Sequence, residues 1–227
     1  MWLVITFENV RKTFDSLVVL DHLDLRVAEN EIVGIVGPSG VGKTTILKLV
    51  TRIITPDSGQ VTVADVHIGY VFQEPRLLPW RTALDNVAVI FRAQGVGKDE
   101  ARRAAHSWLE RVGLQGFEDY HPAELSGGMA QRVSLARAFA AEPRILLMDE
   151  PFSNMDLDLK TSLIGMLQKI AREHKTTIVY VTHELTEALQ IADRIVELTP
   201  ERNLRELDLS DRKKLALDWL SGTLGKF

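Results

Sequence analysis

One glycine-rich run restricts the possible folds of this chain more than any other feature. The residues Gly37-Pro38-Ser39-Gly40-Val41-Gly42-Lys43-Thr44 follow Ile32–Val36, a β-branched run typical of a buried parallel strand. They precede Thr44–Ile54, whose apolar residues have helical spacing. In a strand–loop–helix unit of this kind, backbone N–H groups wrap a phosphate at the helix N-terminus. The alternative, a chance glycine-rich turn, would not need the flanking strand and helix.

The same loop predicts nucleotide binding. Lys43 would reach the β and γ phosphates of the nucleotide, and the Thr44 hydroxyl would bind Mg²⁺. The residues expected to hold the triphosphate are Gly37, Pro38, Ser39, Gly40, Val41, Gly42, Lys43, Thr44 and Thr45.

Composition narrows the class of protein further. With 227 residues, 45% of them apolar and 26% charged, the chain fits one compact α/β unit with an inserted lobe. A formal net charge of −4 gives no basic footprint, so no nucleic-acid partner is expected. The lack of cysteine fits a reducing compartment, the cytoplasm by default. The first residues resemble a strand rather than a signal peptide, and no apolar run reaches the roughly 18–20 residues of a membrane span. Any membrane role would need a partner.

Hydrophobic patterning divides the chain into a β-rich start, a helical middle and a βα end. Short alternating runs at Trp2–Phe7, Leu17–Leu20 and Leu23–Val27 predict an antiparallel layer, and Gln60–Ala64 and Ile68–Phe72 predict two further strands. The remaining expected elements are helices at Leu84–Ala93, Lys98–Val112 and Gly127–Ala140, strand Ile145–Met148, helix Asp158–His174, strand Thr177–Val181, helix Glu184–Ala192, strand Arg194–Leu198 and an amphipathic helix in Asp208–Leu220. The predicted organisation is one domain, 1–227, with a nucleotide-binding core (1–73 and 141–200), a helical lobe (74–140) and a helical tail (201–227).

An acidic pair, Asp149 and Glu150, ends the apolar run Ile145–Met148. A phosphate-loop protein needs one acid to hold Mg²⁺ and a second group to orient or deprotonate water. Asp149 is therefore expected to bind the metal and Glu150 to act as the base. The structural alternative, that two acids simply terminate a strand, is weakened by the phosphate loop elsewhere in the chain.

A second glycine motif, Leu125-Ser126-Gly127-Gly128-Met129, precedes a predicted helix. Ser126 could cap that helix, and the two glycines expose N–H groups to an anion, although a simple helix cap would look the same. With the continuation Ala130-Gln131-Arg132, this segment resembles the signature motif of the ATP-binding cassette family. The resemblance covers Phe7 to about Leu198. It implies a RecA-like P-loop NTPase core with an N-terminal antiparallel β layer and an inserted α-helical lobe.

The resemblance assigns four more residues to the nucleotide site. Phe14 is similar to the aromatic residue that stacks on adenine, although a core phenylalanine remains the alternative. Gln73 is similar to the glutamine that touches Mg²⁺ and the attacking water; a polar strand end is its alternative. Asp156 corresponds to the aspartate that reaches across a dimer, with Asn154 and Met155 in place of the commoner Ala-Leu. His183 is similar to the switch histidine of the γ-phosphate, and its position at a strand end favours that role over a structural one.

The family resemblance also predicts partners. A phosphate loop leaves the γ-phosphate exposed, so Ser126, Gly127 and Gly128 of a second copy would close the site, giving a homodimer that holds two ATP molecules with Mg²⁺. The region 74–87 would receive integral membrane permease subunits at the cytoplasmic face of the membrane. Within it, Arg76-Leu77-Leu78-Pro79-Trp80 is most similar to the subgroup that imports nitrate, sulfonates and taurine with a solute-binding protein, although lobe packing would also account for its apolar residues. The chain ends soon after Leu198, so a regulated sugar-importer type is not expected.

Two other classes of protein compete with this interpretation. A soluble cassette ATPase that acts on ribosomes or DNA would usually carry two cassettes or a long coiled-coil insertion. An unrelated P-loop kinase or GTPase is disfavoured by Ser126–Met129 and by the lack of an Asn-Lys-x-Asp guanine-binding pattern. Co-purification with a membrane protein, or with ribosomes or DNA, would distinguish transport from the first alternative.

Overall fold

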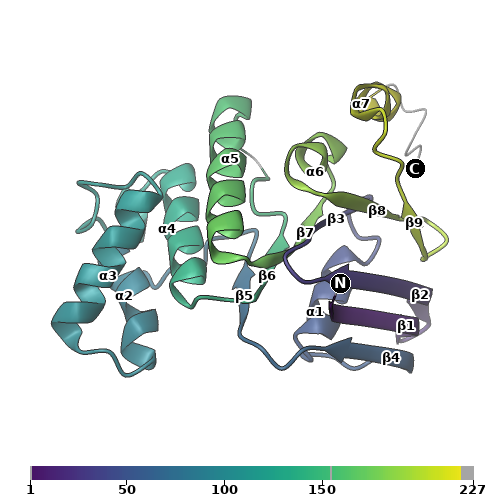
Figure 1. Ribbon diagram of the computed structural model, residues 1–227, viewed down its shortest axis with the longest axis horizontal. Coiled ribbons are helices and arrows are strands. Elements are labelled where there is room, and N and C mark those ends of the chain that lie inside the picture. Colours follow the sequence, from purple (N-terminus) through teal and green to yellow (C-terminus); the bar gives the residue numbers. More distant parts are fainter. Residues whose placement is uncertain (1, 154, 221–227) are drawn as a thin grey trace. The chain divides into compact units, whose positions relative to one another are not determined.

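The computed structural model describes residues 2–153 and 155–220, and Figure 1 shows the order of its elements. The chain forms two compact units, one of residues 1–66 and 175–227 and the other of residues 67–174. Each unit is described by itself. These two units differ from the predicted division into core and lobe. The units group residues whose backbones lie close together, whereas the prediction divides the chain by expected role.

The first unit has an antiparallel sheet of β1 (Leu3–Phe14), β2 (Leu17–Ala28) and β4 (Ser58–Val63), with β1 in the middle. The expectation of three short strands before residue 28 was wrong, because β1 and β2 each run for 12 residues. Polar residues do not end β1 or β2, because β-bulges accommodate the irregular pairing between these strands. Asn9 and His22 take positive φ angles of 50° and 46°, and their side chains hydrogen-bond each other at 2.6 Å.

The first unit also contains the parallel strands β3 (Ile32–Val36), β7 (Thr177–Thr182) and β8 (Arg194–Leu198). All five residues of β3 are buried, as its β-branched composition predicts. Helices α1 (Lys43–Val50) and α6 (Leu185–Ile191) follow β3 and β7, so these two parallel strands each lead into a helix. The carboxyl ends of such strands are where α/β sheets bind ligands.

Two features near the end of the chain differ from the sequence expectation. A short antiparallel strand, β9 (Leu204–Glu206), pairs with β8 and was not predicted, since its three residues include only one apolar side chain. The tail helix α7 runs from Arg212 to Leu220 and begins later than the predicted Asp208. Asp211 sets this start, because its carboxylate accepts a hydrogen bond from the Lys214 backbone N–H at 2.9 Å.

The second unit combines two parallel strands with four α-helices. Strand β5 (Ile68–Val71) pairs with β6 (Ile145–Asp149) in parallel. The α-helices are α2 (Ala83–Ala93), α3 (Lys98–Arg111), α4 (Gly127–Ala140) and α5 (Leu157–His174), and a 3₁₀ turn (η1) covers Pro122–Glu124. Figure 1 shows α2, α3 and α4 side by side.

The helices of the second unit pack through a buried aromatic pair. The Trp108 ring of α3 stacks on Phe139 of α4, with 6.0 Å between ring centroids. His174, at the end of α5, lies 5.3 Å from the same tryptophan ring. Because both rings are large and almost fully buried, this contact fixes α3 against α4, the helix that follows the second glycine motif. None of the helices in the described part of the chain is long and apolar enough to span a membrane.

Candidate ATP site

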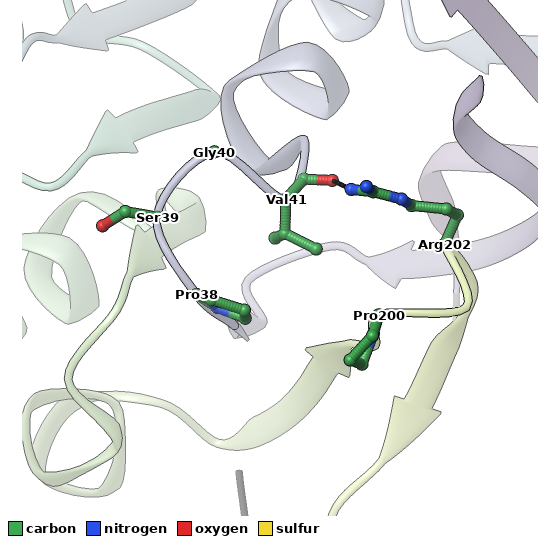
Figure 2. Close-up of a pocket in the computed structure, with 6 residues that line it drawn as sticks. All are labelled: Pro38, Ser39, Gly40, Val41, Pro200 and Arg202. Atoms are coloured by element: carbon green, nitrogen blue, oxygen red, sulfur yellow. Dashed lines mark hydrogen bonds between the residues drawn. The ribbon is translucent and has the colours of Figure 1, made fainter. Parts of the chain in front are cut away.

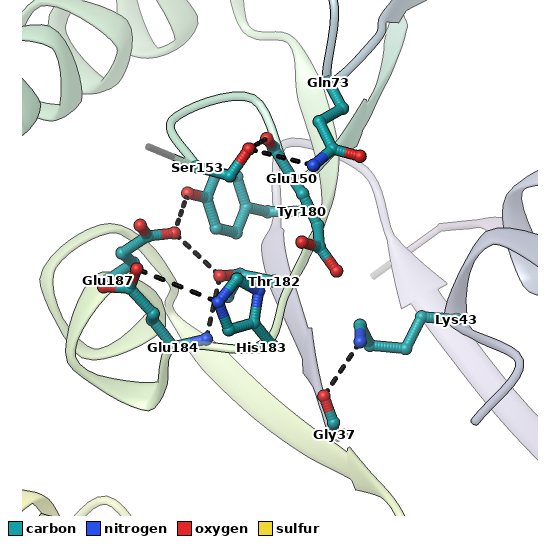
Figure 3. Close-up of polar contacts among 10 residues, drawn as sticks. All are labelled: Gly37, Lys43, Gln73, Glu150, Ser153, Tyr180, Thr182, His183, Glu184 and Glu187. Atoms are coloured by element: carbon teal, nitrogen blue, oxygen red, sulfur yellow. Dashed lines mark hydrogen bonds and ion pairs between the residues drawn. The ribbon is translucent and has the colours of Figure 1, made fainter. Parts of the chain in front are cut away.

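In the phosphate loop of the first unit, the lysine side chain is bonded to the backbone of the same loop. Lys43 is only 4% exposed, and its ammonium group donates hydrogen bonds to the carbonyl oxygens of Gly37 at 2.8 Å and Pro38 at 2.9 Å. Figure 3 shows the contact with Gly37. The positive charge therefore lies beside the backbone that is predicted to wrap the phosphate, at the start of α1.

Two glycines of this loop are required by close packing. A Cβ atom on Gly42 would lie 2.6 Å from Val19 Cγ1, and Gly42 has a φ angle of 120° that L-residues rarely adopt. A Cβ atom on Gly37 would lie 2.7 Å from the Leu198 carbonyl oxygen. Atoms of β2 and β8 thus lie too close to the loop for a side chain at Gly42 or Gly37. This explains why the motif needs glycine at these positions.

An arginine outside the motif also supports the loop. Arg202 Nη1 donates a hydrogen bond of 3.0 Å to the Val41 carbonyl oxygen. Figure 2 shows both residues beside a hollow of about 320 Å³ that Pro38, Ser39, Gly40 and Pro200 also line. The sequence analysis missed Arg202, because it lies 161 positions from Val41 and belongs to no motif.

Phe14 lies at the end of β1 with 44% of its surface exposed, so a buried core role is excluded within the first unit. The Lys12 ammonium lies 5.5 Å from the centre of its ring. Lys12 and Thr13 are in turn held by the carboxylate of Asp57, at 2.7 Å from the lysine nitrogen and 2.6 Å from the Thr13 backbone nitrogen. The contact with adenine remains a prediction, and an exposed ring on a fixed strand end fits it.

His183 follows β7, where its side chain is exposed and lies 4.0 Å from the Glu184 carboxylate. The junction below it is built around a carboxylate that the sequence analysis missed. Glu187 of α6 is 2% exposed and accepts hydrogen bonds of 2.7 Å from the hydroxyls of Tyr180 and Thr182 (Figure 3). These bonds fix the turn that carries His183. A glutamate on the apolar face of α6 was the only signal in the sequence.

In the second unit, β6 presents Asp149 and Glu150 at its carboxyl end. The Tyr70 hydroxyl donates a hydrogen bond of 3.2 Å to Asp149 Oδ2 and orients that carboxylate. Burial raises the pKa of Tyr70, and the neighbouring Asp149 charge raises it further, so the tyrosine remains a donor at neutral pH. Glu150 has a φ angle of 46°, an unfavourable conformation for this residue type. Strained backbone of this kind is concentrated at functional sites.

Gln73 is tied to the segment after Glu150. Its amide nitrogen donates a 3.2 Å hydrogen bond to Ser153 Oγ, which donates in turn to the Glu150 carbonyl oxygen at 3.1 Å (Figure 3). Because the amide nitrogen of Gln73 is bonded to Ser153, its amide oxygen is the atom that can coordinate a cation or accept a hydrogen bond from water.

Ser126 caps α4, as predicted, because its Oγ accepts a 3.2 Å hydrogen bond from the Met129 backbone N–H. Asp156 has a similar local role, since its carboxylate accepts from the Leu159 backbone N–H at 2.9 Å at the start of α5. Its contact across a dimer remains a prediction, and the neighbouring Asn154 lies outside the described residues. A hollow of about 710 Å³ brings together five of the predicted residues of this unit but not Asp149 or Glu150, and its lining includes Gln73, Ser126, Gly127, Gly128 and Asp156.

The proposed metal ligands suit Mg²⁺ by their chemistry. The Thr44 hydroxyl, an Asp149 carboxylate and the Gln73 amide oxygen are hard oxygen donors, which Mg²⁺ prefers. Tyr70 orients Asp149, and Ser153 orients Gln73. No group of three His, Cys, Asp or Glu side chains within residues 2–153 and 155–220 could hold a metal ion. The three oxygen donors fit Mg²⁺ by their chemistry.

A phosphate loop after a buried parallel strand, with a carboxylate pair after another strand, defines a P-loop nucleotide-hydrolysing protein. The family model described as "ABC transporter" matches residues 20–153, more than half of the chain. The chain belongs to this family and is an ABC-type ATPase domain, as the resemblance predicted.

Similar proteins support the same family over most of the chain. An aliphatic sulfonates import ATP-binding protein of Frankia alni is 42% identical over 198 residues, covering 87% of this chain and 78% of that protein. A Fe(3+) ions import ATP-binding protein of Rhizobium etli is 42% identical over 202 residues and covers 85% of this chain. The match spans only 57% of that iron-import protein.

A solved structure confirms the predicted fold class. It is the dimeric structure of a post-hydrolysis state of an ATP-binding cassette bound to ADP and Pi, with a TM-score of 0.81 and 33% identity. The similarity covers 90% of this chain and 98% of that chain. The roles of individual site residues remain predictions for this protein.

Proposed function

We propose that this protein is the ATP-hydrolysing subunit of an importer, and that two copies bind two ATP molecules between them. The observation that carries the proposal is the hollow shared by Gln73, Asp156 and the Ser126–Gly128 segment. Within this hollow, the Ser126–Gly128 segment lies at the N-terminus of α4, the kind of anion-binding surface that a second copy's triphosphate would fit. The solved dimeric cassette supports pairing as the working form.

The residues expected to bind and hydrolyse ATP come from both units. In the first unit, Lys43 and the loop N–H groups would bind the triphosphate, Phe14 would stack on adenine, and His183 would hydrogen-bond the γ-phosphate. In the second unit, Asp149 and Gln73 would bind Mg²⁺, to which Thr44 of the first unit would also bind. Bound Mg²⁺ would neutralise charge on the β and γ phosphate oxygens.

Glu150 would accept the proton of the attacking water. Its positive φ angle aims the residue away from the direction of β6, and the Ser153 bond to its carbonyl holds that turn. General bases of this kind contribute about 10²–10⁴-fold to rate. Gln73 would orient the same water through its amide oxygen, because its nitrogen is already bonded to Ser153.

Replacing Glu150 with glutamine tests the two-copy site. Glu150→Gln keeps the side-chain size and removes the base, so the dissociation constant for ATP should stay within about twofold while turnover falls about 10²–10³-fold. The variant should form a dimer with ATP in light scattering, and wild-type activity per molecule should fall on dilution. A Glu150→Gln protein that turns over normally and stays monomeric contradicts the proposal, as does wild-type activity that is independent of concentration.

An exposed tryptophan supports a permease partner, and the proposed solute of the importer is a small molecule such as nitrate, a sulfonate or taurine. Trp80, in Arg76-Leu77-Leu78-Pro79-Trp80, is 71% exposed, although large apolar side chains are usually buried. A membrane permease that covers this ring at the cytoplasmic face would give the protein a peripheral membrane location. The sulfonate-import relative supports the solute class, whereas the iron-import relative favours ferric ion as the alternative.

Purification of the native complex tests both the transport role and the solute. The tagged chain should co-purify with a polytopic membrane protein, and the Trp80→Ala variant should recover less of it at equal expression. ATPase activity of the reconstituted complex with its solute-binding protein should rise with an alkyl sulfonate. Stimulation by ferric ion alone would identify the other solute class, and recovery of ribosomes or DNA instead of a membrane protein would overturn the transport role.

A further inference from the structure

The loop that follows Gln73 depends on a side chain of α4 for its position. Residues 74–82 form no helix or strand. Arg137 of α4 donates through Nη2 to the Pro75 carbonyl oxygen at 2.8 Å and through Nη1 to the Arg76 carbonyl oxygen at 2.9 Å. One planar guanidinium thus binds two consecutive carbonyls, a geometry that a lysine ammonium cannot reproduce with the same rigidity.

A second side chain of α4 binds the backbone on the other side of Gln73. Gln131, which is 1% exposed, donates through Nε2 to the Phe72 carbonyl oxygen at 3.4 Å. Burial lowers the pKa of Arg137, but an arginine remains charged at neutral pH, so its bonds to carbonyl oxygens are charge-assisted. Helix α4 therefore holds the backbone immediately before and shortly after Gln73.

The far end of the loop is held by another buried side chain. Asn86 of α2 is fully buried and accepts from the Leu78 backbone N–H at 2.7 Å. Its amide nitrogen donates to the carbonyl oxygens of Leu78, Arg81 and Thr82 at 3.0–3.2 Å. Trp80 lies between the two anchored ends and is exposed. A contact made at Trp80 is thus made on a loop that is fixed to α4 and α2.

We propose that Arg137 is a positioning residue for Gln73, which it holds in register with the Ser126–Gly128 segment at the start of the same helix. The inference rests on the proposed function, in which Gln73 orients the attacking water. Because α4 carries the Ser126–Gly128 segment at one end and the anchor of the Gln73 loop three turns later, one rigid helix positions Gln73 for this copy's ATP and Ser126–Gly128 for the partner's ATP. Loss of the anchor displaces Gln73 without touching the phosphate loop, so turnover falls while ATP affinity is retained.

A double-mutant cycle between Arg137 and Gln73 tests the inference in the full chain. Gln73→Ala and Arg137→Ala should each lower kcat by about ten- to a hundredfold, with the KM for ATP within about twofold of wild type. The double variant should be no slower than Gln73→Ala by more than about twofold, since Arg137 acts through Gln73. Multiplicative losses, or an Arg137→Ala variant with wild-type kcat, would overturn the inference.

The matched control is Arg132→Ala. Arg132 lies on the same helix and also donates to a backbone carbonyl, that of Val112 at 2.8 Å, which is remote from Gln73 in the chain. The fold reductions in kcat caused by Arg132→Ala and by Gln73→Ala should multiply in the double variant. If Gln73→Ala itself leaves kcat unchanged, the catalytic role of Gln73 fails, and that outcome is distinct from multiplicative losses.

Arg137→Lys serves as the second variant where Arg137→Ala does not fold. It keeps the charge but offers a single ammonium group, so kcat should lie between those of wild type and Gln73→Ala. Hydrogen exchange should be faster than wild type for the backbone amides of Glu74, Arg76 and Leu77 and unchanged for those of α3. Unchanged exchange in 74–77 would count against the anchor independently of activity.

Discussion

Two of the side chains assigned to ligand binding also cap helices. Ser126 and Asp156 each accept a hydrogen bond from a backbone N–H of the helix that follows. A cap stabilises its helix by about 1 kcal/mol, so either residue would be retained in a fold with no ligand at all. Lys43 differs, because a buried ammonium bonded to two loop carbonyls serves no helix cap.

The carboxylate of Asp57 gives a pH-dependent test of the segment before Phe14. Hydrogen bonds from Lys12 and then Thr13 lower the pKa of Asp57 from 3.8 to about 2. A depressed folded-state pKa contributes stability above pH 3.8 that is lost as the pH falls toward 2. The difference in urea midpoint between wild type and Asp57→Asn should therefore be present near neutral pH and shrink below about pH 4.

Lys12→Met is the control for this prediction, since it removes the first partner of Asp57 and should reduce the same difference. A midpoint difference between wild type and Asp57→Asn that stays constant down to about pH 3 would contradict the assignment.

Strand β7 and helix α6 form the element pair that places His183. Their junction is held by a buried carboxylate with two hydroxyl donors, Tyr180 and Thr182. Both hydroxyls donate to the same oxygen of Glu187, so this one carboxylate holds the end of β7 against α6. The exposed histidine at its edge is thus supported by residues that never need to touch the nucleotide.

Glu187→Ala should destabilise the folded chain by about 2–4 kcal/mol, because it leaves two buried hydroxyls without their acceptor. Urea unfolding measures this loss. Glu184→Ala, three positions earlier and much more exposed, should change stability by less than about 0.5 kcal/mol. Equal losses for the two variants would show that the buried network contributes little.

The whole molecule is expected to work as a pair, and Gly127 offers a direct test. An added Cβ on Gly127 would meet no atom within 4 Å among the described residues. Gly127→Ala should therefore preserve or slightly raise stability, since alanine favours a helix. In the Glu150→Gln background it should nevertheless weaken the ATP-dependent dimer at least about tenfold, because the methyl group would meet the partner's triphosphate.

Gly97→Ala is the matched control, since Gly97 lies at the N-terminal end of helix α3 and an added Cβ there would also meet no atom within 4 Å in the described part of the chain. It should leave dimer formation intact in light scattering with ATP. A Gly127→Ala variant that pairs and hydrolyses like its parent would remove the signature segment from the interface.

Local sequence was enough to predict most of the elements. Strands β3 and β8 and helix α4 lie within the predicted limits, because β-branched runs, helical spacing and a serine cap are signals carried by neighbouring residues. The phosphate loop, the acidic pair and the signature segment were found for the same reason. Each is a short motif whose chemistry requires consecutive residues.

Hydrogen bonds that form between different elements could not be predicted from the sequence. Arg202 reaches Val41, Glu187 joins Tyr180, and Arg137 anchors the loop after Gln73 only once the chain has folded. The continuous β1 and β2 strands also depend on bulges that pair Asn9 with His22. A hydrogen bond between remote residues leaves no periodic trace in the chain, because its geometry is set by the packing of whole elements rather than by neighbours.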